Sequence, residues 1–294
     1  MRLISTRHEG AETLGVVLGD HWLAAGDLVS GAPTTMAALL AGGGVALDAL
    51  RSAAGDAASA QRGRPLEGIQ LLAPLPRPGK IVAIGRNYRE HLNEEGSDQP
   101  PAPLMFSKWP SCVIGPGDEI RWDPALSSQV DYEAELAVVI GRATRRVGEA
   151  DALDHVFGYT CLNDVTARDI QFADGQWVRG KSLDTFCPMG PVLVTADEIG
   201  DPQRLDISTT VNGERRQSAN TSQMYFGVAA IVSYASRSFT LEPGDVIATG
   251  TPGGVGHFRN PPLYLNDGDV VAVEIDGIGR LENTCHFDSA GAAA

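Results

Sequence analysis

Short runs of alternating hydrophobic and polar residues fill most of the chain, and turn signals separate them. The tetrapeptides GPGD (115–118), EPGD (242–245) and NDGD (266–269) each precede a run of this kind, such as DVIATG or DVVAVEI. Strands commonly follow turns of this composition. Asp276-Gly277 predicts a two-residue hairpin between VVAVEI and IGRLENT, because a type I′ turn needs positive φ at both central residues. The pattern predicts a β-rich body.

The first 70 residues have a different pattern. GVVLGDHWLAA predicts a strand, a tight turn and a strand, whereas TTMAALLA and VALDALRSAA predict short helices. The stretch AAGDAASAQRGRPLEG is small and polar, lacks apolar periodicity and predicts a linker. We therefore predict a small N-terminal α+β domain over residues 1–70 and a catalytic domain over residues 71–294.

Three later segments predict helices. KIVAIGRNYREHLNEEG indicates a strand, a turn and a short helix that ends at Gly96. ADALDHVFGYT indicates a second helix. SQMYFGVAAIVSYASR has apolar residues at helical spacing, so we expect it to pack on the sheet.

The run VDYEAELAVVI places three acids at alternate positions of a predicted buried strand. Asp131, Glu133 and Glu135 therefore share one face, which continues with apolar Ala137 and Val139. Buried carboxylates this close repel one another and lose hydration, and a divalent cation would remove both penalties. Oxygen ligands favour Mg²⁺, Mn²⁺ or Ca²⁺ over zinc. An exposed edge strand that carries charges against aggregation would show the same alternation.

Two further groups could complete such a site. Asp164 ends the apolar run YTCLND and could supply a third carboxylate, although an acid there is also typical of a helix N-cap. His91 and Glu94 are three residues apart on a predicted helix, so their side chains share a face. A carboxylate beside an imidazole makes a general base for activating water, whereas a surface ion pair would explain the same spacing. This short helix could move as a lid.

Composition and charge narrow the range of partners. The 294 residues are 43% hydrophobic and 20% charged, which suits one large domain, or one large and one small domain. The net charge of −14 argues against nucleic acid and an anionic membrane as partners. The four cysteines form no CxxC pair, so we interpret them as reduced and buried. No apolar run is long enough for a signal peptide or a membrane span, so we predict a cytoplasmic protein.

Seven motifs in one order resemble the fumarylacetoacetate hydrolase superfamily, and within it the branch of acylpyruvate hydrolases and oxaloacetate decarboxylases and tautomerases. The motifs are GRNYREHLNE, MFSKWPS, DYEAELAVVIG, LNDVTARDIQ, GQWVRGKSLDTFCPMGP, VNGERRQ and GDVIATGTPGGVG. The resemblance runs from Pro76 to Cys285 and implies a β-rich α+β fold. That fold is a mixed β-sandwich roll of the family's C-terminal type, here after a small N-terminal α+β domain. Assembly as a homodimer is also implied.

The resemblance also implies roles for site residues. The ligands implied for one Mg²⁺ or Mn²⁺ are Glu133, Glu135 and Asp164. The implied catalytic residues, a dyad on a lid helix and a lysine near the metal, are His91, Glu94 and Lys181. The implied substrate contacts are Arg86, Lys108, Gln171 and Thr251. Asp131 matches no ligand position, and we interpret it as a support behind the site or as a turn residue.

The implied reaction is divalent-metal-dependent hydrolysis of the C–C bond of 2,4-dioxo acids to pyruvate and a carboxylic acid. Acylpyruvates and sugar-derived 2,4-diketo-3-deoxy acids are the candidate substrates. His91 would deprotonate the attacking water, and Lys181 would stabilise developing negative charge. An oxaloacetate decarboxylase or a keto–enol tautomerase or isomerase would use the same metal enolate and is the alternative. A catalytically silent metal-binding protein is a third hypothesis, but it would have no chemical need for the His91–Glu94 pair.

Overall fold

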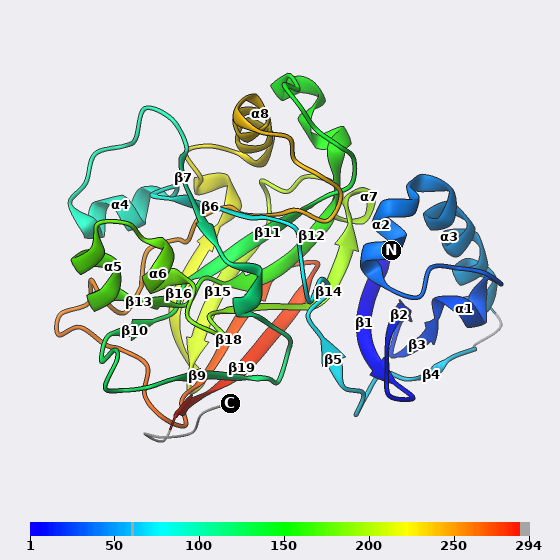
Figure 1. Cartoon of the computed structure of the whole chain (residues 1–294), viewed down its shortest axis with the longest axis horizontal. Helices are drawn as coiled ribbons and strands as arrows, with labels where there is room; N and C mark the ends of the chain where they lie inside the picture. Colours follow the sequence, from blue (N-terminus) through cyan, green and yellow to red (C-terminus); the bar gives the residue numbers. More distant parts are fainter. Residues whose placement is uncertain (60–61, 289–294) are drawn as a thin grey trace.

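Most strands of the molecule belong to one long mixed sheet. The computed structural model describes residues 1–59 and 62–288, and Figure 1 shows the sheet crossing the molecule. In spatial order its strands are β4 (Arg64–Pro65), β3 (His21–Ala24), β2 (Ala11–Leu18), β1 (Arg2–His8), β14 (Cys187–Thr195), β12 (Val156–Asn163), β11 (Ala134–Ile140), β17 (Val246–Ala248), β6 (Ile81–Gly85) and β7 (Leu104–Lys108). Two short strands join it at the side, β5 (Leu71–Leu72) on β1 and β8 (Val113–Ile114) on β14.

A five-stranded sheet packs against the middle of the long sheet. In order its strands are β16 (Glu214–Asn220), β15 (Asp206–Val211), β18 (Val270–Ile275), β19 (Gly279–Phe287) and β9 (Glu119–Trp122). One apolar cluster joins the two sheets and includes Leu136 of β11, Ile207 of β15 and Val273 of β18. A separate pair of two-residue strands, β10 (Val130–Asp131) and β13 (Thr166–Ala167), precedes β11 and follows β12 along the chain.

The helices are short and lie around the sheets (Figure 1). The α-helices are α1 (Ala25–Leu28), α2 (Met36–Gly42), α3 (Gly44–Ser59), α4 (Arg89–Glu95), α5 (Arg168–Asp174), α6 (Val178–Lys181), α7 (Ala196–Ile199) and α8 (Val228–Ser238). The 3₁₀-helices are η1 (Pro110–Cys112), η2 (Glu149–His155) and η3 (Thr221–Gln223). As predicted, α8 buries an apolar face, and α4 ends at Gly96, whose φ of 67° suits glycine.

The N-terminal residues form the strands and helices that the sequence predicts, but they do not form a separate sheet. β1 pairs with β2 on one side and, through Arg2 and Leu3, with β14 on the other. Leu3 also shares an apolar cluster with Ala137 and Val139 of β11. The domain boundary near residue 70 stays a prediction, and the long sheet and this cluster run across it.

Four local predictions are wrong. The predicted linker begins inside α3, because the alanine-rich AAGDAAS has high helix propensity, and its residues 60 and 61 lie outside the described part. ADALDHVFGYT is η2 followed by the buried strand β12. The β18–β19 loop has three residues, and of its predicted turn pair only Gly277 has positive φ, at 74°. The acidic strand breaks at Tyr132 and Glu133, between β10 and β11.

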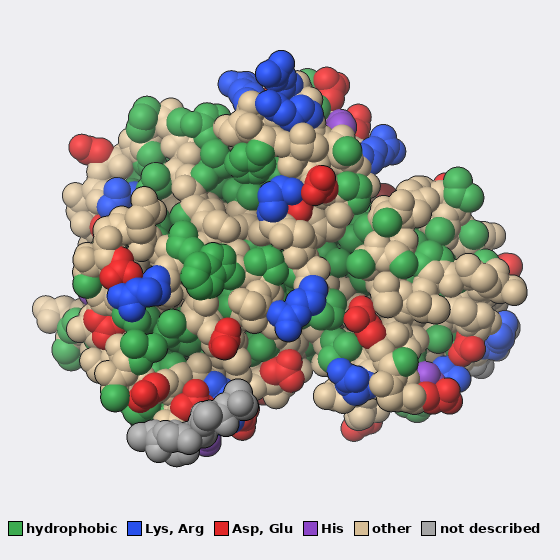
Figure 2. Space-filling model, viewed as in Figure 1, with side chains coloured by type: hydrophobic (Ala, Val, Ile, Leu, Met, Phe, Trp, Pro, Cys, Tyr) green, Lys and Arg blue, Asp and Glu red, His purple; other side chains and the backbone are tan. Residues whose placement is uncertain are grey.

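The cysteines agree with the prediction from the sequence. All four cysteines are free and buried. Over residues 1–59 and 62–288, no single helix is long and apolar enough to cross a membrane, and α2 and α3 pass that test only as a pair bent by 117°. On the face in Figure 2, acidic and basic side chains are interspersed, apart from a group of Lys and Arg side chains near the top.

Candidate active site

Three buried carboxylates converge where β11 begins and β12 ends. Glu135 lies on β11, Glu133 in the break before it and Asp164 directly after β12. One oxygen of each lies within 4.8 Å of the others. The paired strands set this arrangement, since Ala134 lies opposite Asn163 in the register. The Glu133 N–H donates to Asn163 Oδ1 at 2.9 Å, which fixes the break.

Glu135 is the carboxylate of this triad without a cation beside it. Within the described residues its side chain has no ion pair, and it accepts one hydrogen bond, from the Gly250 N–H at 2.7 Å. Burial, and then the charges of Asp164 and Glu133, raise the pKa of Glu135 well above its ordinary value. A divalent cation would offset this penalty, and oxygen ligands suit Mg²⁺ or Mn²⁺. The triad therefore fits the metal that the sequence implies.

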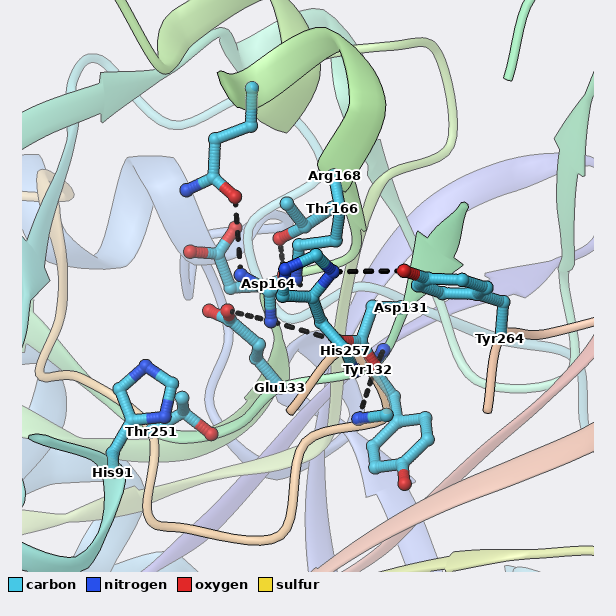
Figure 3. A network of polar contacts seen from close by, with 12 residues as sticks. His91, Asp131, Tyr132, Glu133, Asp164, Thr166, Arg168, Thr251, His257 and Tyr264 are labelled. Atoms are coloured by element: carbon cyan, nitrogen blue, oxygen red, sulfur yellow. Dashed lines mark hydrogen bonds and ion pairs between the residues drawn. The ribbon is translucent and has the colours of Figure 1, made fainter. Parts of the chain in front are cut away.

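Two buried cations that line the cleft hold the other carboxylates. Lys181 Nζ lies 2.6 Å from Glu133 Oε2 and 2.8 Å from Asp164 Oδ2. Arg168 Nη2 lies 2.6 Å from Glu133 Oε1 and 2.9 Å from Asp131 Oδ2. Figure 3 shows Arg168 between these two carboxylates. Burial alone would raise the pKa of Glu133, but the charges of Lys181 and Arg168 outweigh it and lower the pKa to about 2. Glu133 is therefore ionised at neutral pH.

Asp131 lies behind the triad rather than within it, because the strand breaks directly after it. Its carboxylate accepts hydrogen bonds from the N–H groups of Gly256 at 2.8 Å and His257 at 3.0 Å. The same carboxylate binds Arg168, and the network extends through His257 Nδ1 to the Tyr264 hydroxyl, 2.9 Å away (Figure 3). Asp131 thus fixes the arginine that faces the carboxylates.

Lys108 is also placed behind the site, which corrects the predicted substrate contact. Its Nζ lies 2.6 Å from Asp164 Oδ1 and donates to the backbone carbonyls of Val165 and Lys181. Burial alone would lower the pKa of Lys108, but the Asp164 charge outweighs it and the pKa is raised. The side chain is fully buried and does not line the cleft, so it supports Asp164 instead.

A cleft opens beside Glu133 and Glu135. Of the predicted site residues, those that line it are Arg86, His91, Glu133, Glu135, Gln171, Lys181 and Thr251. Sequence reasoning missed part of its lining, namely Arg168 and the aromatic residues Phe106, Phe172, Trp177 and Phe258. A signal existed for Arg168, which precedes Gln171 by one helical turn in α5 and donates to its Oε1 at 3.2 Å.

His91 faces the cleft from α4 with only 7% of its surface exposed. Its Nδ1 lies 4.0 Å from Glu94 Oε2 and has no hydrogen-bond partner among residues 1–59 and 62–288. Glu94 instead accepts a hydrogen bond from the Gly254 N–H at 2.7 Å. Burial lowers the pKa of His91 to about 4, so the imidazole is neutral at pH 7. The predicted dyad is near, but at this distance it is not hydrogen-bonded.

The loop of residues 250–258 contacts the site through its backbone. Three glycine amides donate to three acids, Gly250 to Glu135, Gly254 to Glu94 and Gly256 to Asp131. A Cβ at Gly254 would lie 2.2 Å from the Arg216 carbonyl oxygen, and one at Gly256 would lie 1.8 Å from that of Leu263. The close approach of other backbone explains the repeated glycines of TGTPGGVG.

Comparison with known proteins identifies the family. Residues 80–286 match the family described as fumarylacetoacetate (FAA) hydrolase C-terminal. The chain belongs to the fumarylacetoacetate hydrolase family. It is 51% identical to oxaloacetate tautomerase YisK of Bacillus subtilis over 221 residues, which cover 74% of this chain and 73% of the relative. It is also 51% identical to oxaloacetate tautomerase fahd2, mitochondrial, of Xenopus laevis over 217 residues, 73% of this chain and 68% of the relative.

Solved structures of this fumarylacetoacetate hydrolase family confirm the predicted fold class. Fumarylacetoacetate hydrolase from psychrophilic Exiguobacterium antarcticum has a TM-score of 0.86 and 40% identity, over 98% of this chain and all of that one. Maleylpyruvate hydrolase from Sphingobium sp. SYK-6, in complex with manganese(II) and pyruvate, has a TM-score of 0.80 and 34% identity over the same shares. The chain is thus an enzyme of this family, and the manganese in that relative and the triad here both support a divalent metal.

Proposed function

We propose that this protein catalyses the keto–enol tautomerisation of oxaloacetate with Mg²⁺ or Mn²⁺. The observation that carries the proposal is the buried imidazole of His91, which lines one cleft together with Lys181, Glu133 and Glu135. The names of the relatives at 51% identity favour this reaction over the hydrolysis that the sequence placed first. The alternative was an oxaloacetate decarboxylase or a keto–enol tautomerase or isomerase, and the tautomerase now becomes the main hypothesis.

The chemistry needs a proton acceptor, a proton donor and stabilised negative charge. Glu133, Glu135 and Asp164 would hold the cation, which supplies positive charge that stabilises negative charge on the substrate oxygen. His91 takes a proton from C3 of oxaloacetate, and Lys181 Nζ gives a proton to the oxygen on C2. Solvent then restores both groups, and no water attacks carbon.

Other residues of the cleft would orient the substrate. The Gln171 amide and the Thr251 hydroxyl can donate to its carboxylate, and both are fixed by neighbours. Arg168 donates to Gln171 Oε1 at 3.2 Å, and Gln217 Nε2 donates to Thr251 Oγ1 at 2.8 Å. Such fixed donors lower the cost of ordering the site when substrate binds. A second copy of the chain is the macromolecular partner that we propose, as a homodimer.

Hydrolysis of 2,4-dioxo acids stays as the second candidate. The maleylpyruvate hydrolase structure, with its bound manganese and pyruvate, favours it. In this reaction His91, with Glu94 beside it, would activate water rather than move a proton from carbon.

The cytoplasmic location stays a prediction, and several relatives have the word mitochondrial in their names.

One assay series tests both reactions. Absorbance would follow the keto–enol interconversion of oxaloacetate, and pyruvate release would follow cleavage of acylpyruvates and maleylpyruvate. We expect metal-dependent tautomerisation that EDTA abolishes and that His91→Ala lowers by about 10²–10⁴-fold, the usual range for a positioned acid–base group. His21→Ala is the matched control, because the His21 side chain is half-exposed and does not line the cleft. A higher kcat/KM for cleavage than for tautomerisation would make the hydrolase the function instead.

A further inference from the structure

Arg86 is a cation of the cleft that the proposed proton transfers do not use. It directly follows β6 and lines the cleft together with its partner Glu95. Its Nε lies 3.0 and 2.9 Å from the two Glu95 oxygens, and its Nη2 also donates to Glu95. The guanidinium carbon lies 5.9 Å from the centroid of the Trp177 ring. Two neighbours therefore fix this side chain.

The pair leaves part of the guanidinium free for a ligand. A guanidinium has five N–H donors, and Glu95 takes those of Nε and Nη2. Throughout the described chain, no residue bonds to Nη1 of Arg86. The other cations that line the cleft, Arg168 and Lys181, are each bound to buried carboxylates. Arg86 thus combines positive charge with unused donors at the cleft.

The surroundings of Arg86 are built to hold it in place. Its backbone has a φ of 58°, a left-handed conformation that is costly for a residue with a Cβ. Such conformations persist where the surrounding structure fixes them, and they gather at functional sites. The preceding Gly85 lets the indole approach closely, because a Cβ there would lie 2.5 Å from Trp177 Cζ3. Phe106 packs edge-on against the same indole, with ring centroids 5.3 Å apart.

We propose that Arg86, positioned by Glu95 and Trp177, binds the distal carboxylate of a four-carbon 2-oxo diacid. It would thereby select dianionic over monoanionic 2-oxo acids. The inference rests on the proposed function, because it assumes that the 2-oxo acid end lies at the carboxylate triad. Glu95 keeps the pair neutral in the free enzyme and aims the remaining N–H groups. Phe172 and Phe258, which also line the cleft, offer no charge to that carboxylate.

The test compares oxaloacetate with 2-oxobutanoate, which has a methyl group in place of the distal carboxylate. Exchange of the C3 protons with deuterium reports on both substrates in one NMR assay. The readout is the kcat/KM for oxaloacetate divided by that for 2-oxobutanoate. Arg86→Gln should lower this ratio about 10–100-fold through KM, the range for a hydrogen bond between charged groups. Arg86→Lys keeps the positive charge but loses the planar set of N–H donors of the guanidinium, so it should give an intermediate ratio.

The positioning role of Glu95 has its own signature. Glu95→Gln keeps an acceptor for Arg86 but gives the pair a net positive charge. It should lower KM for oxaloacetate and raise the ratio, with kcat little changed. Arg89→Gln is the matched control, since Arg89 begins the same helix α4, lies over the Tyr225 ring at 5.4 Å and does not line the cleft. If Arg86 has only a structural role, Arg86→Gln would lower kcat/KM equally for both substrates. That result would overturn the inference.

A binding measurement separates this inference from the proposed function. Calorimetry with Mn²⁺ would compare malate with 2-hydroxybutanoate, which bind without reacting. If the wild type does not tautomerise oxaloacetate but prefers malate, and Arg86→Gln removes the preference, the function fails and the inference stands. If the wild type tautomerises oxaloacetate and Arg86→Gln leaves the preference for malate unchanged, the inference alone fails.

Discussion

Lys181 Nζ lies 2.6 Å from Glu133 Oε2, and the same nitrogen lies 2.8 Å from Asp164 Oδ2. Both carboxylates belong to the triad that fits a divalent cation. The lysine and a bound metal would therefore compete for the negative charge of Glu133 and Asp164, although the proposed reaction needs both.

This competition predicts opposite effects of one substitution. Lys181→Met should tighten Mn²⁺ binding by about tenfold, because a unit charge at this range interacts by about 1 kcal/mol or more. It should also lower tautomerisation strongly, because the proton donor is lost. Calorimetry and steady-state kinetics measure the two effects, and Lys80→Met at the surface is the control. Weaker Mn²⁺ binding in Lys181→Met would show that the lysine organises the carboxylates instead.

Two neighbouring glutamates should affect the metal-free protein in opposite directions. The raised pKa of Glu135 means that its ionisation costs folding free energy once the pH exceeds the unfolded value. Glu135→Gln should therefore raise Tm in EDTA at pH 7. The lowered pKa of Glu133 gives stability that is present above the unfolded pKa and lost as pH falls toward 2. Glu133→Gln should cost about 3–5 kcal/mol, as breaking a buried ion pair does.

Thermal unfolding followed by circular dichroism distinguishes these outcomes. Both substitutions should weaken Mn²⁺ binding, since each removes a charged ligand. Tm shifts of the same sign for the two metal-free variants would contradict the view that Glu135 alone lacks a counter-charge.

The activity should persist to unusually low pH for a reaction that depends on histidine. Burial lowers the pKa of His91 to about 4, so the proton acceptor stays neutral well below the ordinary value near 6.5. kcat/KM should fall with a midpoint near pH 4. The unfolded chain takes up this proton earlier, so His91 also reduces folding stability as pH falls from 6.5 toward 4. A pH–rate profile checks this, and a midpoint near 6.5 would mean that His91 is hydrated in the active enzyme.

The helix α4 should become more protected when a 2-oxo acid analogue binds. It contains only seven residues, and its contact with the rest of the site includes the Glu94–Gly254 hydrogen bond. Hydrogen exchange of residues 86–103 should slow with oxalate and Mn²⁺. Glu94→Ala should speed this exchange in the free enzyme, whereas Glu90→Ala on the same helix should not. Identical exchange with and without oxalate would argue against a lid.

Local patterns were enough to predict several elements of the site. β6, α4 and Gly96 follow from an apolar run, a helical spacing and a glycine stop, all within one short stretch. The three ligands of the triad were predicted from one strand and one resembling motif, and the structure brings them together. These signals are local, so a single sequence contains them.

The remaining features depend on contacts between distant segments. The strand that carries the acids is divided into β10, which pairs with β13, and β11, which pairs with β12, and no local pattern indicates this change of partner. Lys108 looked like a substrate contact, but the pairing of β6 with β7 carries it behind Asp164. The segment after His155 was predicted to be helical, and its burial between β11 and β14 makes it a strand.

The contacts of residues 250–258 mean that backbone N–H groups, as well as side chains, hold the acidic residues of the site in place. Alanine scanning tests side chains. It would report Val255 or Pro252 as packing residues and would show that the glycines do not tolerate substitution, but it would not reveal the hydrogen bonds that their N–H groups donate. Exchanging the amide of Gly254 for an ester would delete one hydrogen-bond donor and leave every side chain in place. In this loop the path of the polypeptide, more than its side chains, connects Glu135, Glu94 of helix α4 and Asp131.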